Sequence, residues 1–336
     1  MERIESEHVV FGAGLVGGFL GAALMASDQS VGWVVREATR KKLQSGLKLT
    51  DYHDNEATVT DLQFVTPNTE GLFDVPPPRY LWLTVKCTAL DAVLQEIKSL
   101  VGPETIIICL QNGLGAEDQV QQAFPNHTVI RGVMAANVAE LQPGHLHRGT
   151  QGGIMLPKQS ETEALVPAFQ QPALPLRLLD DLTGLLWAKL QLNLNNPINA
   201  LADITLKQEL DQRDYRRVLA AAMEELLSVA KAKGIELPQL GPQPPHRTPK
   251  LLRLPNWIYR RAGHKVDAKA RSSMWQDLKD GRQTEIDFLN GAVARLGEEL
   301  GVACPVNQAL TQLIHDVEAG KRARGIGARE LWDLVS

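Results

Sequence analysis

The first half of the chain alternates short, continuous apolar runs with segments whose apolar residues recur at helical spacing. The apolar runs, of which the last two are the weakest, are Val9–Phe11, Val31–Val35, Tyr80–Val85, Thr105–Leu110, Val129–Ala135 and Gly153–Leu156. Between the third and fourth of them, Ala89–Leu100 has the apolar spacing of a helix. Continuous apolar strands that alternate with helices are typical of a parallel sheet covered on both faces. The pattern therefore predicts an α/β fold whose N-terminal part is a Rossmann-type, doubly wound parallel sheet.

The pattern changes near residue 180, where strand-like runs stop and longer amphipathic segments begin. The segments that predict helices are Leu182–Leu201, Tyr215–Lys233, Thr284–Leu300 and Asn307–Lys321. The proline-rich stretch Pro238–Pro255 predicts a long connection across the surface, because proline stops helices and lacks a backbone donor. We therefore expect two domains: residues 1–181 as a Rossmann-type domain and residues 182–336 as an all-helical domain.

A glycine cluster follows the first apolar run and has the spacing GxGxxG. Gly12 permits a tight turn, Gly14 lets the backbone approach a pyrophosphate, and Gly17 lets the helix pack closely on the sheet. The backbone N–H groups at the start of the helix, where Leu15 and Val16 lie, would bind the pyrophosphate. The strand before the motif and the apolar helix after it predict a dinucleotide site.

Polar residues follow three other predicted strands, at the edge where a doubly wound sheet binds its ligands. Arg36 follows the second strand and is suited to the 2′-phosphate of NADP, although the neighbouring Glu37 leaves NAD as the alternative. Lys86 and Asn112 follow the third and fourth strands, so both are candidates for binding cofactor or substrate. Asn112 is also half of a common turn pair with Gly113.

Polar residues recur at helical spacing in a leucine-rich segment of the second half. Lys189, Asn193 and Asn196 are spaced i, i+4, i+7 and would share one helix face. Such a face could donate to a carbonyl group and bind hydroxyls, or it could be a stripe in contact with solvent. Ser273 lies just before a helix, where hydroxyls also act as caps, and Glu285 borders an apolar stripe as a catalytic or capping carboxylate.

Composition and charge exclude several other classes of protein. The 336 residues carry a net charge of −4, which gives no electrostatic reason to expect a nucleic acid partner. The three cysteines lie far apart, and the H-x-H pair His145 and His147 lacks further ligands, so we expect no metal. No apolar run reaches the length of a membrane span and the N-terminus lacks a secretory signal, which predicts a cytoplasmic protein without a membrane partner.

Together these motifs resemble those of the ketopantoate reductase (2-dehydropantoate 2-reductase) family. The matching segments follow the family order over most of the chain: GAGLVGG at 12–18, Arg36, VK at 85–86, QNG at 111–113, WAKLQLN at 187–193, SSMWQDL at 272–278, TEIDFLNG at 284–291 and PVN at 305–307. The resemblance implies that residues 1–181 form an NADP-binding domain and that residues 182–336 form a helical domain for substrate binding and catalysis, with a substrate cleft between the two. It also implies that NADPH (NADP+) is the cofactor and that a 2-keto acid is reduced to a 2-hydroxy acid.

The resemblance also implies roles for individual residues. Lys189 corresponds to the general acid that protonates the developing alkoxide, and Glu285 resembles the acid that orients the substrate and this lysine. The residues implied in substrate binding are Asn193, Asn196 and Ser273, with Lys86 and Asn112 at the rim of the cofactor and substrate sites.

The chain departs from the family pattern at three places. The segment after Lys189 is one residue shorter before Asn196, and Ala270 stands where the family has an asparagine three residues before the matched serine. A second asparagine, which the family has after the catalytic segment, has no clear counterpart near Leu206. These changes affect substrate contacts more than the reaction. The expected activity is reduction of ketopantoate to pantoate in pantothenate and coenzyme A biosynthesis. The alternatives are a reductase of another branched or aromatic 2-keto acid, a non-catalytic NADPH-binding sensor, and a related dehydrogenase of phosphorylated or amino substrates. A homodimer is a possible assembly.

Overall fold

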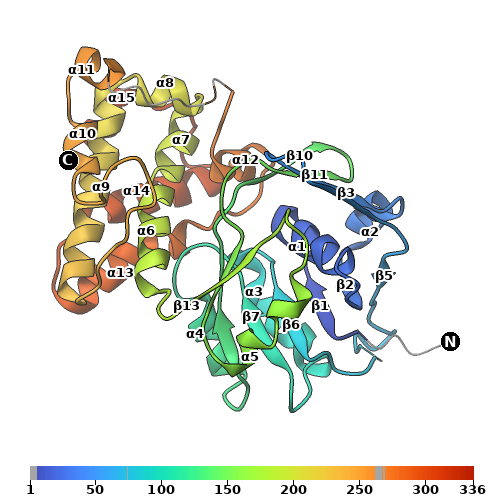
Figure 1. Ribbon diagram of the computed structural model, residues 1–336. Coiled ribbons are helices and arrows are strands. Elements are labelled where there is room, and N and C mark those ends of the chain that lie inside the picture. The colour runs from blue at the N-terminus through green and yellow to red at the C-terminus, as the bar shows by residue number, and fades with distance from the viewer. Residues whose placement is uncertain (1–5, 74, 262–266, 268) are drawn as a thin grey trace. The chain divides into compact units, whose positions relative to one another are not determined.

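The structure, a computed structural model, describes residues 6–73, 75–261, 267 and 269–336 (Figure 1). The chain divides into two units. Unit 1 consists of Met1–Gln111 and Ala116–Leu182, and unit 2 consists of Asn112–Gly115 and Thr183–Ser336. The short segment Asn112–Gly115 therefore packs with the helical unit, although it lies within the first half of the sequence.

Unit 1 is built on a six-stranded sheet in which every pair of neighbouring strands is parallel. In spatial order the strands are β5 (Gln63–Phe64), β2 (Val31–Val34), β1 (His8–Phe11), β6 (Tyr80–Leu83), β7 (Ile106–Cys109) and β8 (Val129–Arg131). The four central strands are buried along their whole length, as their continuous apolar sequence predicts. The strand order reverses between β1 and β6, which is the point where doubly wound sheets bind their ligands. The predicted fold class is confirmed.

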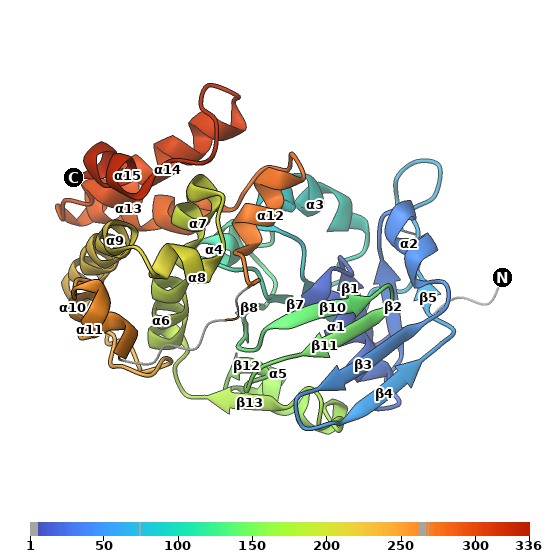
Figure 2. The same cartoon turned by 90° about the horizontal axis from the view of Figure 1, so that it is seen from above.

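Two smaller sheets complete unit 1. In Figure 2, β10 (Val138–Gln142), β11 (His145–Arg148), β3 (Leu47–Asp51) and β4 (Glu56–Val59) run side by side in this order. The third sheet has the order β13 (Leu176–Leu179), β12 (Ile154–Pro157) and β9 (Val133–Met134). The sequence analysis did not predict the four-stranded sheet, because its strands mix exposed polar with buried apolar residues and none is a continuous apolar run.

The helix after the glycine motif, α1 (Leu15–Met25), contacts strands of two sheets. Its neighbours are β1 and β2 of the large sheet and β3, β4, β10 and β11 of the four-stranded sheet. The small residues of α1 make this double contact possible. A Cβ on Gly18 would lie 2.9 Å from Leu146, and one on Gly21 would lie 2.4 Å from the ring of Trp33. The other helices of unit 1 are α2 (Glu37–Leu43), α3 (Leu90–Glu96), α4 (Ala116–Ala123) and α5 (Ser160–Glu163).

A buried ion pair joins two strands of the four-stranded sheet. Arg148 Nη2 donates to Asp51 Oδ2 at 2.6 Å, and both side chains are almost fully buried. Burial opposes the charge of Asp51, but hydrogen bonds from Asn55, from the backbone of His53 and Asn55, and from Arg148 outweigh it and hold its pKa below the ordinary value. The pair is therefore a fixed part of unit 1.

The described residues of unit 2 form helices and connecting turns but no strand, and many of the helices contact the long helix α9 (Arg213–Ala232). Figure 1 shows its helices in yellow-green to red. They are α6 (Thr183–Asn193), α7 (Asn196–Ala202), α8 (Leu206–Leu210), α10 (Thr248–Leu252), α11 (Asn256–Arg261), α12 (Ser273–Lys279), α13 (Asn290–Leu300), α14 (Pro305–Glu318) and α15 (Ala328–Val335), with the 3₁₀ turn η4 (Ile286–Phe288). One apolar cluster fills the space between these helices and contains Leu194, Val218 and Leu226.

Three sequence predictions about the helices were wrong in detail. The segment 182–201 forms two helices, α6 and α7, because Pro197 has no N–H to donate to the carbonyl four residues earlier, that of Asn193. The segment 284–300 starts as the turn η4 and becomes helical only at Asn290. The proline-rich stretch is not a plain connection, since it contains α10 with Pro249 in its first turn.

Candidate functional site

The glycine turn of unit 1 is held by close contacts that leave no room for a side chain at Gly12 or at Gly17. The N–H of Gly12 donates to the oxygen of Val34 at 2.9 Å, and Gly12 has a φ of 97°, which favours glycine. A Cβ on Gly17 would lie 2.0 Å from the carbonyl oxygen of Gly12 and 2.2 Å from the hydroxyl oxygen of Thr84. That hydroxyl donates to the carbonyl oxygen of Gly12. Thr84, which sequence reasoning did not single out, thus fixes the turn from the neighbouring strand β6.

The space beside Gly14 is open. A Cβ built on Gly14 meets no atom within 4 Å, and no side chain caps the N-terminus of α1, whose first residues are Leu15 and Val16. The first N–H groups of a helix have no partner within the helix and carry a partial positive charge. The turn therefore combines a close helix–strand contact at Gly17 with an accessible helix N-terminus, which fits a pyrophosphate.

Arg36 and Lys86 lie after β2 and β6, on the same edge of the sheet as the glycine turn. Arg36 is exposed and is the N-cap residue of α2. The neighbouring Glu37 lies 3.9 Å from the ammonium of Lys41, one helical turn further on. Lys86 is half-buried and is the N-cap residue of the 3₁₀ turn that starts at Cys87. The structure thus places both cations at the carboxyl ends of parallel strands, the edge that the sequence predicts for ligand binding.

Asn112 lies in the segment that packs with unit 2. Gly113 has a φ of 80°, and a Cβ there would lie 2.1 Å from the carbonyl oxygen of Phe288. The N–H of Leu114 donates to the same oxygen at 3.0 Å. Phe288 ends η4, for which Glu285 is the N-cap residue. The structure therefore brings the Asn112 loop and the Glu285 turn, which are far apart in sequence, into direct contact within unit 2.

The buried amides of Asn290 and Asn307 form a hydrogen bond just after the Glu285 turn in the sequence. Asn290 Nδ2 donates to Asn307 Oδ1 at 2.9 Å, and Asn307 Nδ2 donates to Glu225 Oε2 at 2.6 Å. Glu225 also accepts the backbone N–H groups of Val306 and Asn307 at the start of α14. Burial raises the pKa of Glu225, although these hydrogen bonds favour its charged form. The TEIDFLNG and PVN motifs are thus joined by one hydrogen-bond network.

Lys189 and Asn193 lie four residues apart on α6, as predicted, and both are half-buried. Asn196 does not continue this helix but begins α7, because Leu194 and Asn195 form a turn between the two helices. The predicted single polar face is therefore two adjoining helix ends. Asn193 is the last residue of α6 and Asn196 the first of α7, so both flank the break.

The N-terminus of α12 is tied to α7. Ser272 caps α12 by accepting the N–H of Trp275 at 3.1 Å, and its hydroxyl donates to the oxygen of Asn196 at 3.2 Å. The N–H of Ser272 donates to Asn199 Oδ1 at 2.9 Å. Ser273 is exposed and is the first residue of α12. The structure thus brings two predicted substrate-binding residues, Asn196 and Ser273, to one junction.

A carboxyl group lies beneath this junction. Asn199 Nδ2 donates to Glu209 Oε2 at 3.0 Å, and Glu209 on α8 is 1% exposed. Burial raises the pKa of Glu209 to about 8, although hydrogen bonds from Asn199 and Asn195 favour its charged form. Sequence reasoning placed Ser272 in a segment of hydroxyls that could cap a helix, as it does, but missed Asn199 and Glu209, because neither belongs to a spacing pattern that indicates chemistry. A buried polar residue in an apolar helix, such as Asn199, was the available signal.

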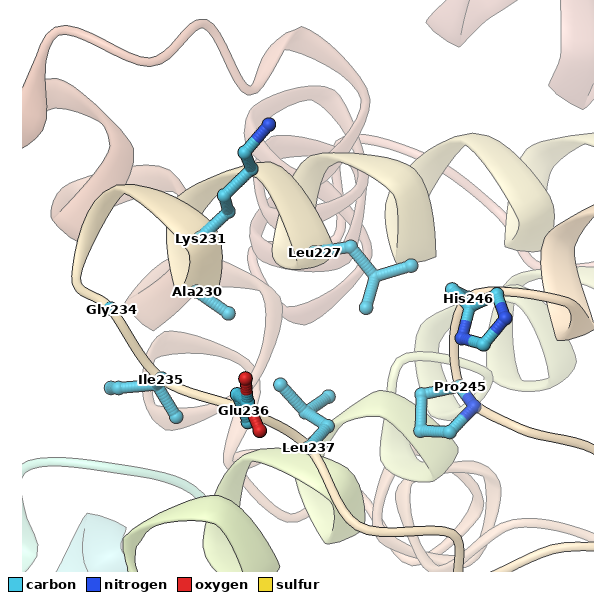
Figure 3. A pocket seen from close by; sticks show the side chains of 9 residues that line it. All are labelled: Leu227, Ala230, Lys231, Gly234, Ile235, Glu236, Leu237, Pro245 and His246. Carbon is cyan, nitrogen blue, oxygen red and sulfur yellow. The ribbon is translucent and has the colours of Figure 1, made fainter.

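Unit 2 also contains a pocket of about 450 Å³ beside the last turns of α9 and the segment that follows it (Figure 3). Its lining residues are Leu227, Ala230, Lys231, Gly234, Ile235, Glu236, Leu237, Pro245 and His246. None of the predicted site residues lines this pocket. Of the described helices of the whole chain, none combines the length and the apolar character that crossing a bilayer requires.

Family models match both halves of the chain. Residues 8–161 match "Ketopantoate reductase PanE/ApbA", and residues 181–318 match "Ketopantoate reductase PanE/ApbA C terminal". The 2-dehydropantoate 2-reductase of Streptococcus pyogenes serotype M6 is 30% identical over 244 residues, which cover 70% of this chain and 75% of that protein. The chain belongs to the ketopantoate reductase family. Members of this family are nicotinamide-nucleotide-dependent oxidoreductases that act on CH–OH groups.

Solved structures share the fold of this family member. The PanE/ApbA family ketopantoate reductase from Ralstonia eutropha JMP134 has a TM-score of 0.76 and 24% identity, covering 94% of this chain and 100% of that one. A D-mandelate dehydrogenase in complex with NADH and anilino(oxo)acetate has a TM-score of 0.75 and 23% identity, covering 93% and 99% of the two chains. At these identities the likeness shows the fold, and the substrate has to be argued from the residues of the chain.

Proposed function

We propose that this chain uses NADPH to reduce 2-dehydropantoate to pantoate, with unit 1 binding the cofactor and unit 2 binding the keto acid. The observation that carries the proposal is the junction of α6, α7 and α12. There Lys189 and Asn193 share α6, while Asn196 and Ser273 are linked through the capping hydroxyl of Ser272. A cation one helical turn before Asn193, and neutral donors at the ends of α6, α7 and α12, suit a ligand with a carboxylate and a carbonyl.

The residues of unit 1 fit a dinucleotide by the space around them as well as by their spacing in the sequence. Gly14 is open on the side where a phosphate would approach, whereas Gly17 is closed by Gly12 and Thr84. The guanidinium of Arg36 is exposed after β2, where it can form paired hydrogen bonds with a 2′-phosphate. NADPH, when bound, supplies the hydride. We propose that the residues of unit 1 holding it are Gly12, Gly14, Leu15, Val16, Gly17, Arg36 and Lys86. We also assign a cofactor contact to Asn112, which belongs to unit 2.

The chain itself supplies the proton and the orientation of the substrate. Negative charge develops on the carbonyl oxygen as the ketone is reduced, and the ammonium of Lys189 stabilises that charge and donates a proton from Nζ. Asn193 and Asn196 donate to substrate oxygens, and Ser273 donates to the carboxylate. Glu285 orients the substrate and the ammonium of Lys189.

A second candidate is the reduction of another branched or aromatic 2-keto acid. The specific observation in its favour is that Ala270, which stands where the family pattern has an asparagine, contacts the start of α8. The N–H of Leu206 donates to the oxygen of Ala270 at 2.9 Å. One amide side chain is thus missing from this place in unit 2, which favours a less polar substrate side chain there.

The test is oxidation of NADPH, followed by absorbance, with a panel of 2-keto acids that includes ketopantoate and phenylglyoxylate. We expect ketopantoate to be turned over fastest. Lys189→Ala should lower kcat by roughly 10³-fold, because both the stabilising charge and the proton donor are lost. Faster turnover of an aromatic keto acid would replace the first candidate by the second.

A matched control is Lys231→Ala, which removes a lysine of the same unit on α9, outside the proposed site. This variant should keep the kcat of the wild type. Retention of most activity by Lys189→Ala, with ketopantoate still reduced, would contradict the assigned proton donor and leave the substrate assignment intact.

A further inference from the structure

The buried carboxyl of Glu209 has no counter-ion among the hydrogen bonds and ion pairs of the described residues. It is 1% exposed, Oε2 accepts from Asn199 Nδ2, and the polar groups that favour its charged form are the neutral amides of Asn199 and Asn195. The described ion pairs of α8 and the residue after it involve Lys207, Asp211 and Arg260, not Glu209. A buried carboxyl without a cation is costly to keep, because even the neutral form loses its hydration. Its place in the fold therefore calls for a reason.

Glu209 fixes the orientation of the Asn199 amide. Asn199 is fully buried, and its Nδ2 donates to Glu209 Oε2 and to the oxygen of Ile204, both at 3.0 Å. With both amide hydrogens directed to α8 and the turn before it, the Oδ1 atom is directed to the N–H of Ser272 at 2.9 Å. A reversed amide would place NH₂ against that N–H and would lose these bonds.

The Ser272 backbone sets the geometry of two proposed substrate contacts. Its N–H is held by Asn199, and its hydroxyl caps α12 and donates to the oxygen of Asn196. Ser273 follows directly as the first residue of α12. Helix α8 holds the same segment a second time, since the N–H of Leu206 donates to the oxygen of Ala270. The path from Glu209 to Ser273 thus consists of two hydrogen bonds and one peptide step.

We propose that Glu209 is a positioning residue for substrate binding, which acts through Asn199 to hold the start of α12, and thereby Ser273 and Asn196, in place for the keto acid. This proposal rests on the proposed function for the identity of the ligand. Glu209 touches neither substrate nor cofactor. Burial raises the pKa of this carboxyl to about 8, which favours its protonated form at neutral pH.

The test compares two substitutions of similar volume. Glu209→Gln keeps an acceptor for Asn199 in a neutral side chain, whereas Glu209→Leu removes the acceptor. For Glu209→Leu we expect the KM for the keto acid to rise about tenfold, as for loss of one buried hydrogen bond. Its kcat and its Kd for NADPH should stay near the wild-type values, and Glu209→Gln should restore the KM.

A second readout needs no turnover. Amide hydrogen exchange of residues 270–277 should be faster in Glu209→Leu than in the wild type and unchanged in Glu209→Gln. Val229→Ala, a core truncation on α9, controls for a general loss of stability and should leave exchange at 270–277 unchanged. If the wild type reduces no keto acid, the proposed function fails while the exchange data still decide the role of Glu209. Unchanged KM and unchanged exchange in Glu209→Leu, or equal changes in Val229→Ala, would overturn the positioning role.

Discussion

The glycine turn of unit 1 and the α7–α12 junction of unit 2 hold their proposed ligand groups in different ways. The turn depends on close backbone approach: a side chain on Gly12 would collide with Val85, and a side chain on Gly17 would collide with the carbonyl oxygen of Gly12 and with Thr84. The junction depends on side chains, because hydrogen bonds join Glu209 to Asn199, Asn199 to Ser272, and Ser272 to Asn196. The first depends on shape, while the second depends on which atoms carry protons.

This difference explains why one site was predictable in detail and the other was not. Glycines that serve a tight turn must stand at fixed spacing within one strand–turn–helix unit, so the sequence displays them together. The partners at the junction come from α7, α8 and α12, and Ser272 is 73 residues from Asn199. Local spacing cannot indicate such contacts. Helical spacing and the family resemblance indicated Asn196 and Ser273, but neither indicated Asn199 and Glu209.

The largest effect is expected from closing the glycine turn. Gly17→Ala places a Cβ within 2.2 Å of Gly12 and Thr84 atoms, so α1 must move away from the sheet. We expect the Kd for NADPH to rise at least about 100-fold and the free energy of unfolding to fall by about 2 kcal/mol. Fluorescence titration with NADPH and urea denaturation measure the two quantities.

Gly14→Ala is the matched control for this prediction. Its Cβ meets no atom within 4 Å, so the fold should keep its free energy of unfolding while a phosphate at the helix N-terminus is obstructed. Weakened NADPH binding without loss of stability is therefore expected. Wild-type affinity for NADPH in Gly14→Ala would show that the cofactor does not approach this turn.

The same comparison holds for the predicted folds of the two units. The strands of the large sheet were predicted because burial on both faces requires continuous apolar runs, as in Ile106–Cys109. In unit 2 the helical spacing of residues 182–201 predicts a single helix, although Pro197 marks the place where the structure divides it into α6 and α7. The four-stranded sheet was missed because strands such as Val138–Gln142 are largely exposed and resemble loop sequence.

A smaller effect is expected from pH, and it should be confined to the α7–α12 junction. The folded pKa of Glu209, about 8, lies above that of an exposed glutamate, so its contribution to stability is complete below about pH 4.5 and is lost as the pH rises through 8. Between pH 6 and 8 the wild type should lose about 2 kcal/mol more of its free energy of unfolding than Glu209→Gln. Urea denaturation of both proteins at several pH values measures this difference.

Other groups with shifted pKa values, including Glu225, are present in both proteins, so the comparison isolates Glu209. Burial raises the pKa of Tyr215 to about 12, and burial lowers the pKa of His8 in unit 1 to about 4. The His8 effect increases stability as the pH rises towards 6.5 and is common to both proteins, so it cancels in the comparison. Parallel pH dependences of the wild type and Glu209→Gln would mean that Glu209 is ionised in the folded protein at neutral pH.

The smallest effect concerns the one charged side chain that we assign to cofactor choice in unit 1. Arg36→Ala should raise the KM for NADPH about tenfold and leave the KM for NADH unchanged, because only NADPH carries the 2′-phosphate. Lys41→Ala, one helical turn away and paired with Glu37, removes the same charge and should change neither value by more than about twofold. Equal losses in the two variants would assign the preference to general attraction of a phosphate by positive charge. A loss confined to Arg36→Ala would show that the backbone turn binds any dinucleotide, and that one guanidinium placed by the end of β2 selects between the two cofactors.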